Sequence, residues 1–422
     1  MKITGSPFFR AFVFALGYGC LFYLLQFFFA ETTLLGIHPG TANLRSWDVV
    51  YYESIARNGY DGTSHNTGFF ILFPLLWKLS GFNIWGICAF NICCFATGFA
   101  FLSRALQVTD KIIYMLWLSL PSGYFFFLPY TEALFFLLGA IILYAVRQER
   151  PVLCWIALFL VSLVRPTASM LIPAFLAMEL FSNPKKDWWK SILRTGYRYI
   201  APILAALSLF VVWQYRQTGI WFAYFKTQAT IWGHVFSWPG IPFTNIAGGD
   251  DRYHWLSSLA ILIDLLALAL LIRQLIRWLR NRDLEDKTFI LAAGYLAMLL
   301  VNLLFMNPKY GNQTSNIMGA NRHSLATPFF FVFLYRLCQV QCSRRQLLYV
   351  FLLLNAFWIL FGAYHTFSAW YTIALINDLL IMTFLCWRSQ ERYSWLAFPV
   401  IAFNFFVQLH LFQQFITPLY VD

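Results

Sequence analysis

Long apolar stretches separated by short polar connections repeat along almost the entire chain. Many of these stretches have roughly 18 or more residues, enough to cross ~30 Å of hydrocarbon as a helix. The sequence does not show the short alternating segments of a membrane β-barrel. The pattern therefore predicts an all-α, polytopic integral membrane protein with about 13 transmembrane helices (11–13). The predicted spans are 7–30, 84–103, 112–128, 130–146, 151–165, 167–181, 198–215, 255–272, 288–306, 325–341, 346–364, 369–387 and 395–413.

Three connections on one side of this arrangement are long enough to hold a functional site: 31–83, 216–254 and 307–324. The first follows the apolar run Pro7–Ala30, which is too long for the core of a signal peptide. We expect this run to stay in the protein as its first helix. The loop after it is predicted to hold two short interfacial helices, at residues 47–57 and 69–79.

The first interfacial helix is predicted from its amphipathic spacing. One face is expected to carry the apolar and aromatic residues Trp47, Val50, Tyr51 and Ile55. Ser46 is a suitable N-cap, and Gly59 is a suitable end. Such a helix lies in the plane of the membrane surface, so it would hold Asp48 at the depth of the lipid headgroups.

Composition and charge narrow the class of protein. The chain is 60% hydrophobic and 11% charged, against about 25% charged residues in soluble proteins. With the N-terminus inside, most of the 30 Lys and Arg residues fall in short cytoplasmic loops. This is the positive-inside bias, so the net charge of +12 reflects orientation in a lipid bilayer and not a nucleic-acid partner. Any catalytic chemistry is then expected at the outer membrane face.

The outer connections carry the polar residues from which an active site could be built. Asp48 is the acid that the first interfacial helix would present, and a carboxylate can accept a proton from a hydroxyl group. Arg165 and Arg322 each adjoin the end of an apolar helix. Arginine there can clamp a phosphate with two hydrogen bonds, or it can extend to lipid headgroups. Both interpretations stay open on sequence alone.

Neither a metal site nor a disulfide framework is predicted. The seven histidines map to outer loops or outer helix ends without metal-ligand spacing, and no D-x-D motif occurs in an outer loop. The eight cysteines lie in predicted helices or near their cytoplasmic ends. Cys338-x-x-x-Cys342 could be a metal pair, but free thiols are the simpler interpretation. We therefore expect no cofactor.

Five short pieces of sequence occur in order along about three quarters of the chain. They are Trp47-Asp48-x-x-Tyr51-x-x-x-Ile55-Ala56-x-x-Gly59-Tyr60, Phe69-Phe70-x-x-Phe73-Pro74-Leu75, Pro129-Tyr130-Thr131-Glu132, Val164-Arg165-Pro166-Thr167 and Asn321-Arg322. Together they resemble the PIG-V family, the GPI mannosyltransferase 2 group, including its shorter bacterial-type homologues. Two departures, Glu53 in place of an apolar residue and Thr131 in place of serine, leave the acceptor open.

The resemblance implies a GT-C glycosyltransferase fold. Residues 1–215 would form the catalytic module, with the active site in loop 31–83, and residues 216–422 a second helical module. The implied reaction is inverting transfer of a sugar, typically mannose, from a polyprenyl- or dolichyl-phosphate donor to a lipid or glycan acceptor. By that resemblance Trp47 and Asp48 are the essential pair. The compact loops favour a bacterial inner membrane with a periplasmic site, the alternative being the endoplasmic reticulum with a lumenal site.

We assign catalysis, as general base, to Asp48. Lipid phosphate is a good leaving group, so a single displacement needs this base and cations on the departing phosphate, but no general acid. Glu132 is expected to bind sugar hydroxyls or to orient Arg165. The residues expected to bind substrate are Trp47, Tyr51, Tyr52, Glu132, Arg165, Lys309, Arg322 and His323.

Two other functions stay open. A transporter or lipid flippase would use acids within the membrane, and Asp264 and Asp378 fall in the middle of predicted helices. Matched helices broken by Gly or Pro, which mark many transporters, are not evident in the sequence. A membrane scaffold whose outer loops bind a partner is the other alternative. Release of lipid phosphate from a polyprenyl-phosphate sugar would distinguish the enzyme from both.

Overall fold

The chain folds into a bundle of helices, and the one sheet among the described residues is a pair of two-residue strands. The computed structural model describes residues 6–31, 37–62, 65–238, 255–280, 285–306, 309–310, 314–315, 319–362, 367–389 and 391–417. The α-helices are α1 (Pro7–Glu31), α2 (Asp48–Asn58), α3 (Leu72–Ser80), α4 (Ile84–Leu106), α5 (Lys111–Leu118), α6 (Glu132–Arg147), α7 (Pro151–Val161), α8 (Leu171–Phe181), α9 (Trp188–Thr195), α10 (Ala201–Thr218), α11 (Ala223–Thr230), α12 (Trp255–Leu279), α13 (Lys287–Phe305), α14 (Ala320–Ser324), α15 (Pro328–Leu337), α16 (Arg344–Gly362), α17 (Phe367–Ser389) and α18 (Ala397–Ile416).

Short segments of tighter or wider helix connect several of these elements. They are η2 (His65–Gly68), η3 (Pro121–Phe127), η4 (Pro166–Met170), η5 (Lys185–Asp187), η6 (Gly196–Ile200) and η8 (Glu391–Leu396). The strands β1 (Lys309–Tyr310) and β2 (Thr314–Ser315) pair antiparallel. Apart from this pair, the described regular elements are helices, so the predicted all-α class is confirmed. The long apolar helices given next support a multi-pass membrane protein.

Within the described residues, six helical runs are long and apolar enough to cross a membrane. They are Pro7–Ala30, Ile84–Leu106, Lys185–Thr218, Trp255–Leu279, Lys287–Phe305 and Tyr393–Ile416. A seventh would be the pair Pro121–Phe127 and Glu132–Arg147, which is bent by 103° at its break. The count of about 13 spans stays a prediction.

Some predicted spans differ from the helices that form. Residues 112–128 are not one helix, because α5 ends at Leu118 and a new 3₁₀ segment begins at Pro121. Proline has no backbone N–H and cannot continue the hydrogen-bond ladder. The basic stretch 185–198, expected as a cytoplasmic loop, is helical and runs on into α10. In α9 (Trp188–Thr195) pairs of apolar residues alternate with pairs of polar residues, as in an amphipathic helix.

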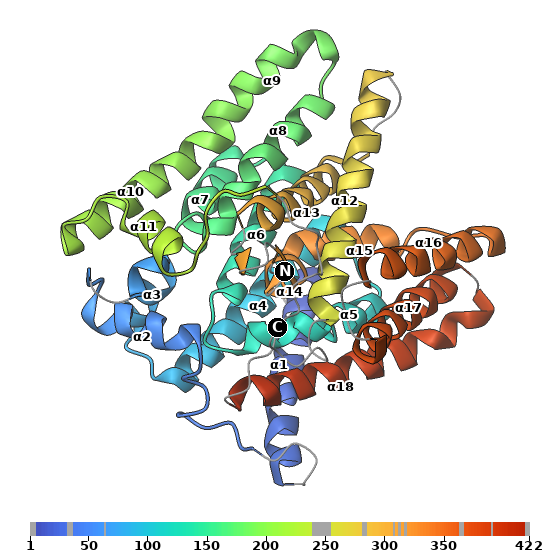
Figure 1. The fold of residues 1–422 in the computed structure, drawn as a ribbon, viewed down its shortest axis with the longest axis horizontal. Coiled ribbons are helices and arrows are strands. Elements are labelled where there is room, and N and C mark those ends of the chain that lie inside the picture. Colours follow the sequence, from blue (N-terminus) through green and yellow to red (C-terminus); the bar gives the residue numbers. More distant parts are fainter. Residues whose placement is uncertain are drawn as a thin grey trace.

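The core is apolar and aromatic, and α4, α6 and α13 lie within it. The most extensive packing joins α4 to α6, α1 to α4, α8 to α13 and α12 to α13. Figure 1 shows α16, α17 and α18 on one side of the molecule and α2, α3, α10 and α11 on the other. The last long helix, α18, returns to α1, since the Tyr18 hydroxyl donates a hydrogen bond to Gln408 Oε1 at 2.7 Å.

Several helix ends that carry basic residues meet at one end of the bundle. Arg147, at the end of α6, forms an ion pair with Asp286, which caps the start of α13. Arg336, at the end of α15, lies 2.6 Å from Glu285. The opposite ends of α6 and α15 begin at Glu132 and Pro328, and the polar cluster described below lies there.

Candidate active site

The local sequence around Glu132, Arg165 and Arg322 determines where each of these residues stands relative to its helix. Glu132 is the first residue of α6, where the positive end of the helix dipole favours an acid. Arg165 precedes Pro166 and is extended (φ −151°, ψ 147°), since a residue before proline avoids the helical region. Arg322 lies in α14, which starts after Gly319 at φ 76°. Glycine adopts this left-handed conformation without steric cost.

These side chains form a connected group with Asp48, the first residue of α2. Arg322 Nη1 lies 2.6 Å from Asp48 Oδ2, and Arg322 Nε donates to Glu132 Oε1. Arg165 Nη1 lies 3.0 Å from the same Glu132 oxygen. The structure therefore brings together four of the predicted site residues from positions up to 274 apart in sequence.

Burial differs sharply across this cluster. The Glu132 side chain is 0% exposed, whereas that of Asp48 is 24% exposed. A buried carboxylate needs charged or hydrogen-bonding partners. The two arginines supply them for Oε1, whereas Oε2 has no hydrogen-bond partner among the described residues. Glu132 thus orients Arg165 and Arg322. Direct contact of Glu132 with sugar hydroxyls, the other prediction, stays a prediction.

Tyr130 supports both members of the exposed pair. Its ring lies under the Arg322 guanidinium, 4.5 Å from ring centroid to Cζ, and its hydroxyl accepts a hydrogen bond from the Asp48 backbone N–H at 3.2 Å. A desolvated cation over a tyrosine face is attracted by the ring quadrupole. Tyr130 therefore fixes the position of Arg322 relative to the start of α2.

His323, adjacent to Arg322, is neutral in this arrangement. Burial lowers the pKa of its imidazole well below the ordinary value, and the charges of Arg165 and Arg322 lower it further. Arg165 Nη2 lies 2.6 Å from His323 Nδ1. Arginine can only donate, so Nδ1 accepts and the ring proton resides on Nε2. His323 can thus offer one N–H donor without adding charge.

Arg322 stays positively charged despite its surroundings. Burial alone would lower the pKa of its guanidinium, but the carboxylates of Glu132 and Asp48 outweigh that effect and the pKa is raised. Two acids and two arginines in contact leave the cluster close to neutral. A further negative group, such as a phosphate, would therefore compete with Asp48 for Arg322.

A buried acid in α12 binds the α14 segment. Ser324 Oγ donates to Asp264 Oδ2 at 2.7 Å, and Asp264 is 0% exposed within α12. Asp378, in α17, accepts a hydrogen bond from Trp358 Nε1 at 2.9 Å. Both acids that a transporter was expected to use thus have structural partners on other elements.

Trp47 has an unusual backbone. Its φ of 58° and ψ of −128°, with the Val49 N–H donating to the Ser46 carbonyl at 3.3 Å, describe a type II′ turn. Glycine is the residue that this position favours. The predicted Ser46 cap is wrong, because its hydroxyl donates to the Asn43 carbonyl and α2 has no side-chain cap. Trp47, the strained residue of this turn, directly precedes Asp48.

The buried face of α2 also differs from the prediction. Val49, Tyr52, Ile55 and Ala56 are buried, whereas Val50 is 53% exposed. The helix packs on α3 and on Tyr130, so tertiary contacts and not the apolar count select the face. Tyr52, one of the residues expected to bind substrate, is buried against Phe73 and Tyr130, and its role stays a prediction.

Tyr51 forms none of the ion pairs of this cluster. Tyr51 stacks on Phe69 with ring centroids 4.8 Å apart, and Trp232 lies edge-on to it. Trp47 is 36% exposed. The Lys309 side chain lies outside the described residues. Tyr51 therefore belongs to an aromatic group with Phe69 and Trp232.

Sequence reasoning missed two residues of the site. Tyr130 belongs to the sequence piece Pro129-Tyr130-Thr131-Glu132, and its position two residues before Glu132 could have indicated a role in the site. Asp264 was assigned to a different function, although a mid-helix acid signals a buried polar contact of some kind. Within the described ranges, no group of three His, Cys, Asp or Glu residues could hold a metal ion.

Comparisons of the chain with family models, curated proteins and solved structures found no match. The resemblance to the PIG-V family rests on the five sequence pieces. That resemblance and the GT-C fold stay predictions.

Proposed function

We propose that this protein is an inverting glycosyltransferase that moves a sugar, most simply mannose, from a polyprenyl- or dolichyl-phosphate donor to a lipid or glycan acceptor. The observation that carries the proposal is the Asp48–Arg322 pair at 2.6 Å, partly open to solvent and backed by buried Glu132 and Arg165. A base beside phosphate-binding cations is the set of groups that this reaction needs.

In this proposal Asp48 accepts the proton of the acceptor hydroxyl. The hydroxyl oxygen attacks the anomeric carbon, and the bond from that carbon to the donor phosphate breaks. The lipid phosphate leaves with the electron pair of that bond. Arg322 would exchange Asp48 for a phosphate oxygen, which frees the carboxylate at the moment when the negative charge develops.

The position of the cluster supports chemistry on the outer face. It lies at the end of the bundle opposite the basic ends of α6 and α15, and basic ends mark the cytoplasmic side by the positive-inside rule. A lipid-linked donor in a bacterial inner membrane, or in the endoplasmic reticulum, would present its sugar at this depth. The short α2 and α3 suit an interfacial position.

The test is sugar transfer by the Asp48→Asn variant. With radiolabelled polyprenyl-phosphate mannose in detergent, we expect transfer and release of lipid phosphate to fall about 10²–10⁴-fold, since an amide cannot accept the proton. The matched control is Asp61→Asn, an exposed acid in the same connection, which should keep full activity. Undiminished transfer by Asp48→Asn, with folding checked by thermal unfolding, would remove Asp48 as the base.

A further inference from the structure

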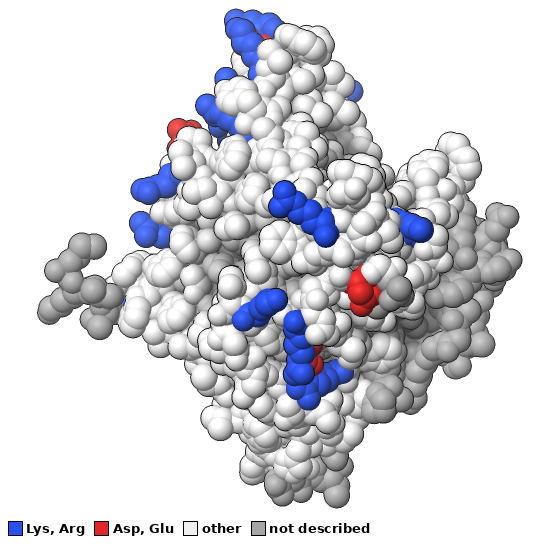
Figure 2. Space-filling model, turned by 90° about the vertical axis from the view of Figure 1, so that its left-hand side faces the viewer, with Lys and Arg blue, Asp and Glu red and all other residues white. Residues whose placement is uncertain are grey.

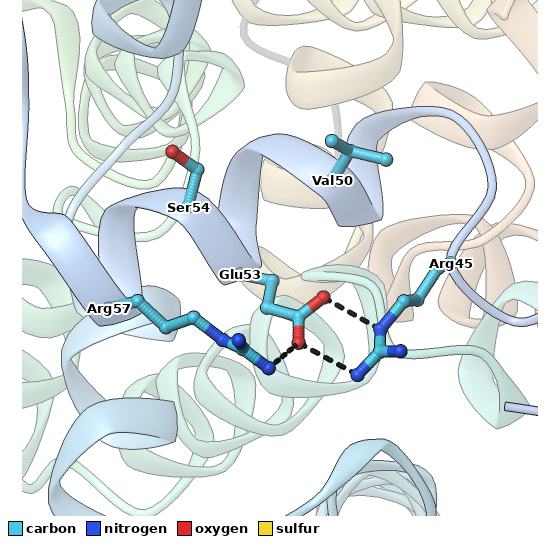
Figure 3. Close-up of a pocket in the computed structure, with 5 residues that line it drawn as sticks. All are labelled: Arg45, Val50, Glu53, Ser54 and Arg57. Carbon is cyan, nitrogen blue, oxygen red and sulfur yellow. Dashed lines mark hydrogen bonds and ion pairs between the residues drawn. The ribbon is translucent and has the colours of Figure 1, made fainter. Parts of the chain in front are cut away.

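A groove lies against α2, apart from the Asp48 cluster. Two overlapping cavities of about 360 and 500 Å³ form it, between α2, α3 and the start of α4. The lining residues that matter here are Arg45, Glu53, Arg57, Trp77, Lys78 and Phe82. Figure 3 shows Glu53 between the guanidinium groups of Arg45 and Arg57.

The charges in this groove do not balance. Arg45 meets both Glu53 oxygens at 2.9 and 3.1 Å, and Arg57 Nη2 lies 2.5 Å from Oε1 of the same carboxylate. Lys78 forms no ion pair with any described residue. Three cations against one acid leave an excess of two positive charges (3 − 1) in the groove. An anion is the ligand that this excess favours.

The start of α4 adds to the same field. Asn83 and Ile84 line the groove, and Asn83 Oδ1 caps the helix by accepting from the Gly86 N–H at 2.9 Å. The 23-residue helix directs its positive end here. This contribution is smaller than that of the three side chains, but it has the same sign.

The groove also has an apolar side. Trp77 and Phe82 line it, and Phe82 is 47% exposed. The neighbouring Leu79 is 74% exposed. Figure 2 shows the side of the molecule where α2 and α3 lie, with scattered basic groups and a few acidic ones on a mostly uncharged surface. A cationic groove with an apolar border fits an amphiphile better than it fits a soluble anion.

The groove is separate from the candidate active site. Arg57 follows Asp48 by nine residues, and at about 100° per residue nine residues amount to two and a half turns of helix. The two side chains therefore leave α2 on opposite faces. Neither cavity is lined by Asp48, Glu132, Arg165 or Arg322.

We propose that this groove binds the phosphate of an anionic membrane lipid. The phosphate contacts Arg57 and Lys78, and the acyl chains leave past Phe82 and Leu79 into the bilayer. Glu53 holds Arg45 and Arg57 together, and its negative charge limits the strength of binding. The proposal does not depend on sugar transfer, so it can fail or succeed independently of the Asp48 chemistry.

The experiment uses the purified full chain in detergent with a photoactivatable phosphatidylglycerol, followed by mass spectrometry of the labelled peptides. We expect labelling within residues 72–84, competed by phosphatidylglycerol and not by phosphatidylcholine. The double variant Arg57→Gln with Lys78→Gln should need about 30-fold more lipid for the same labelling. The matched control, Arg216→Gln, removes an exposed arginine outside the groove and should behave as wild type.

A third variant distinguishes binding from a structural role. Glu53→Gln removes the one acid, so it should increase labelling at low lipid concentration, whereas loss of a merely structural pair would decrease it. Equal competition by phosphatidylcholine, equal weakening by Arg216→Gln, or reduced labelling in Glu53→Gln would overturn the proposal. Complete displacement of the label by inorganic phosphate would show that the occupant is a free anion and would overturn the lipid assignment.

Discussion

Arg322 connects three functions that usually belong to separate residues. It pairs with the exposed acid, neutralises the buried Glu132 and stacks on Tyr130. A planar guanidinium can do this because its donors point in several fixed directions, whereas a lysine ammonium is a point charge. The geometry of the cluster therefore depends on the shape of this side chain as well as on its charge.

Trp47 gives a test of backbone strain at the residue scale. Normally alanine is at least as stabilising as glycine. At φ 58° and ψ −128° the order should reverse, so Trp47→Gly should be more stable than Trp47→Ala by about 1–2 kcal/mol. Both variants lose the same ring, and the difference isolates the turn. Thermal unfolding monitored by circular dichroism measures it, and an alanine variant as stable as the glycine variant would refute the strained turn.

His323 gives a pH test at the same scale. Its pKa is lowered in the folded protein, so the unfolded state binds the proton more readily. The stability that the neutral imidazole of His323 contributes is complete above about pH 6.5, the pKa in the unfolded state. It is lost as the pH falls through the lowered pKa of the folded state. We expect the wild-type unfolding temperature to drop between about pH 7 and pH 5, and to drop less in His323→Gln. The same slope in both proteins would contradict the lowered pKa of His323.

At the scale of elements, α4 and α6 approach closely at a glycine. A Cβ on Gly98 would lie 2.8 Å from Leu137 Cα and 2.9 Å from Phe136 Cδ1. Because a backbone atom is involved, the two helices would have to separate. The start of α6 carries Glu132, so this contact also determines where the buried carboxylate lies.

Gly98→Ala should therefore destabilise the protein by about 1–3 kcal/mol, as overpacking does in other cores. The matched control is Gly17→Ala in α1, where a Cβ would meet nothing within 4 Å. That change should be neutral or stabilising by about 0.5–1 kcal/mol, since alanine is the better helix former. Unfolding midpoints of the two variants check this. Equal effects would show that α4 and α6 are less closely packed.

At the scale of the whole molecule, the candidate site joins the two predicted modules. Asp48, Glu132 and Arg165 come from residues 1–215, and Arg322 and His323 come from residues 216–422. The last helix also packs against residues 1–215, since Gln408 Nε2 donates to the carbonyls of Leu118 and Leu120 at 3.0 and 2.9 Å. Neither predicted module contains the complete cluster alone.

Gln408→Leu tests this packing. The variant leaves two buried carbonyls and the Tyr18 hydroxyl without their partner, which should cost about 1–3 kcal/mol. Combined with Tyr18→Phe, the loss should be smaller than the sum of the single changes, because the two side chains share one hydrogen bond. A double-mutant cycle of unfolding free energies measures this, and strict additivity would argue against the contact.

The sequence by itself determined the class of the protein and much of its candidate site. Apolar runs of sufficient length predicted helical spans, since the bilayer requires each backbone group to bond within its own segment. Asp48, Glu132, Arg165 and Arg322 stood out because charges are rare in such a chain and adjoined helix ends. Gly59 correctly predicted the end of α2, because a terminal glycine tolerates a positive φ.

Only the tertiary structure decided which face of α2 is buried and which charged residues pair with one another. Tyr52 is buried and Val50 exposed because α2 packs against α3 and Tyr130, contacts that no local period reveals. The Asp264–Ser324 bond and the shared Glu132 oxygen join residues distant in sequence. The local sequence pattern shows how hydrophobic each position is. Ion-pair partners depend on the packing of distant segments, which only the whole chain determines.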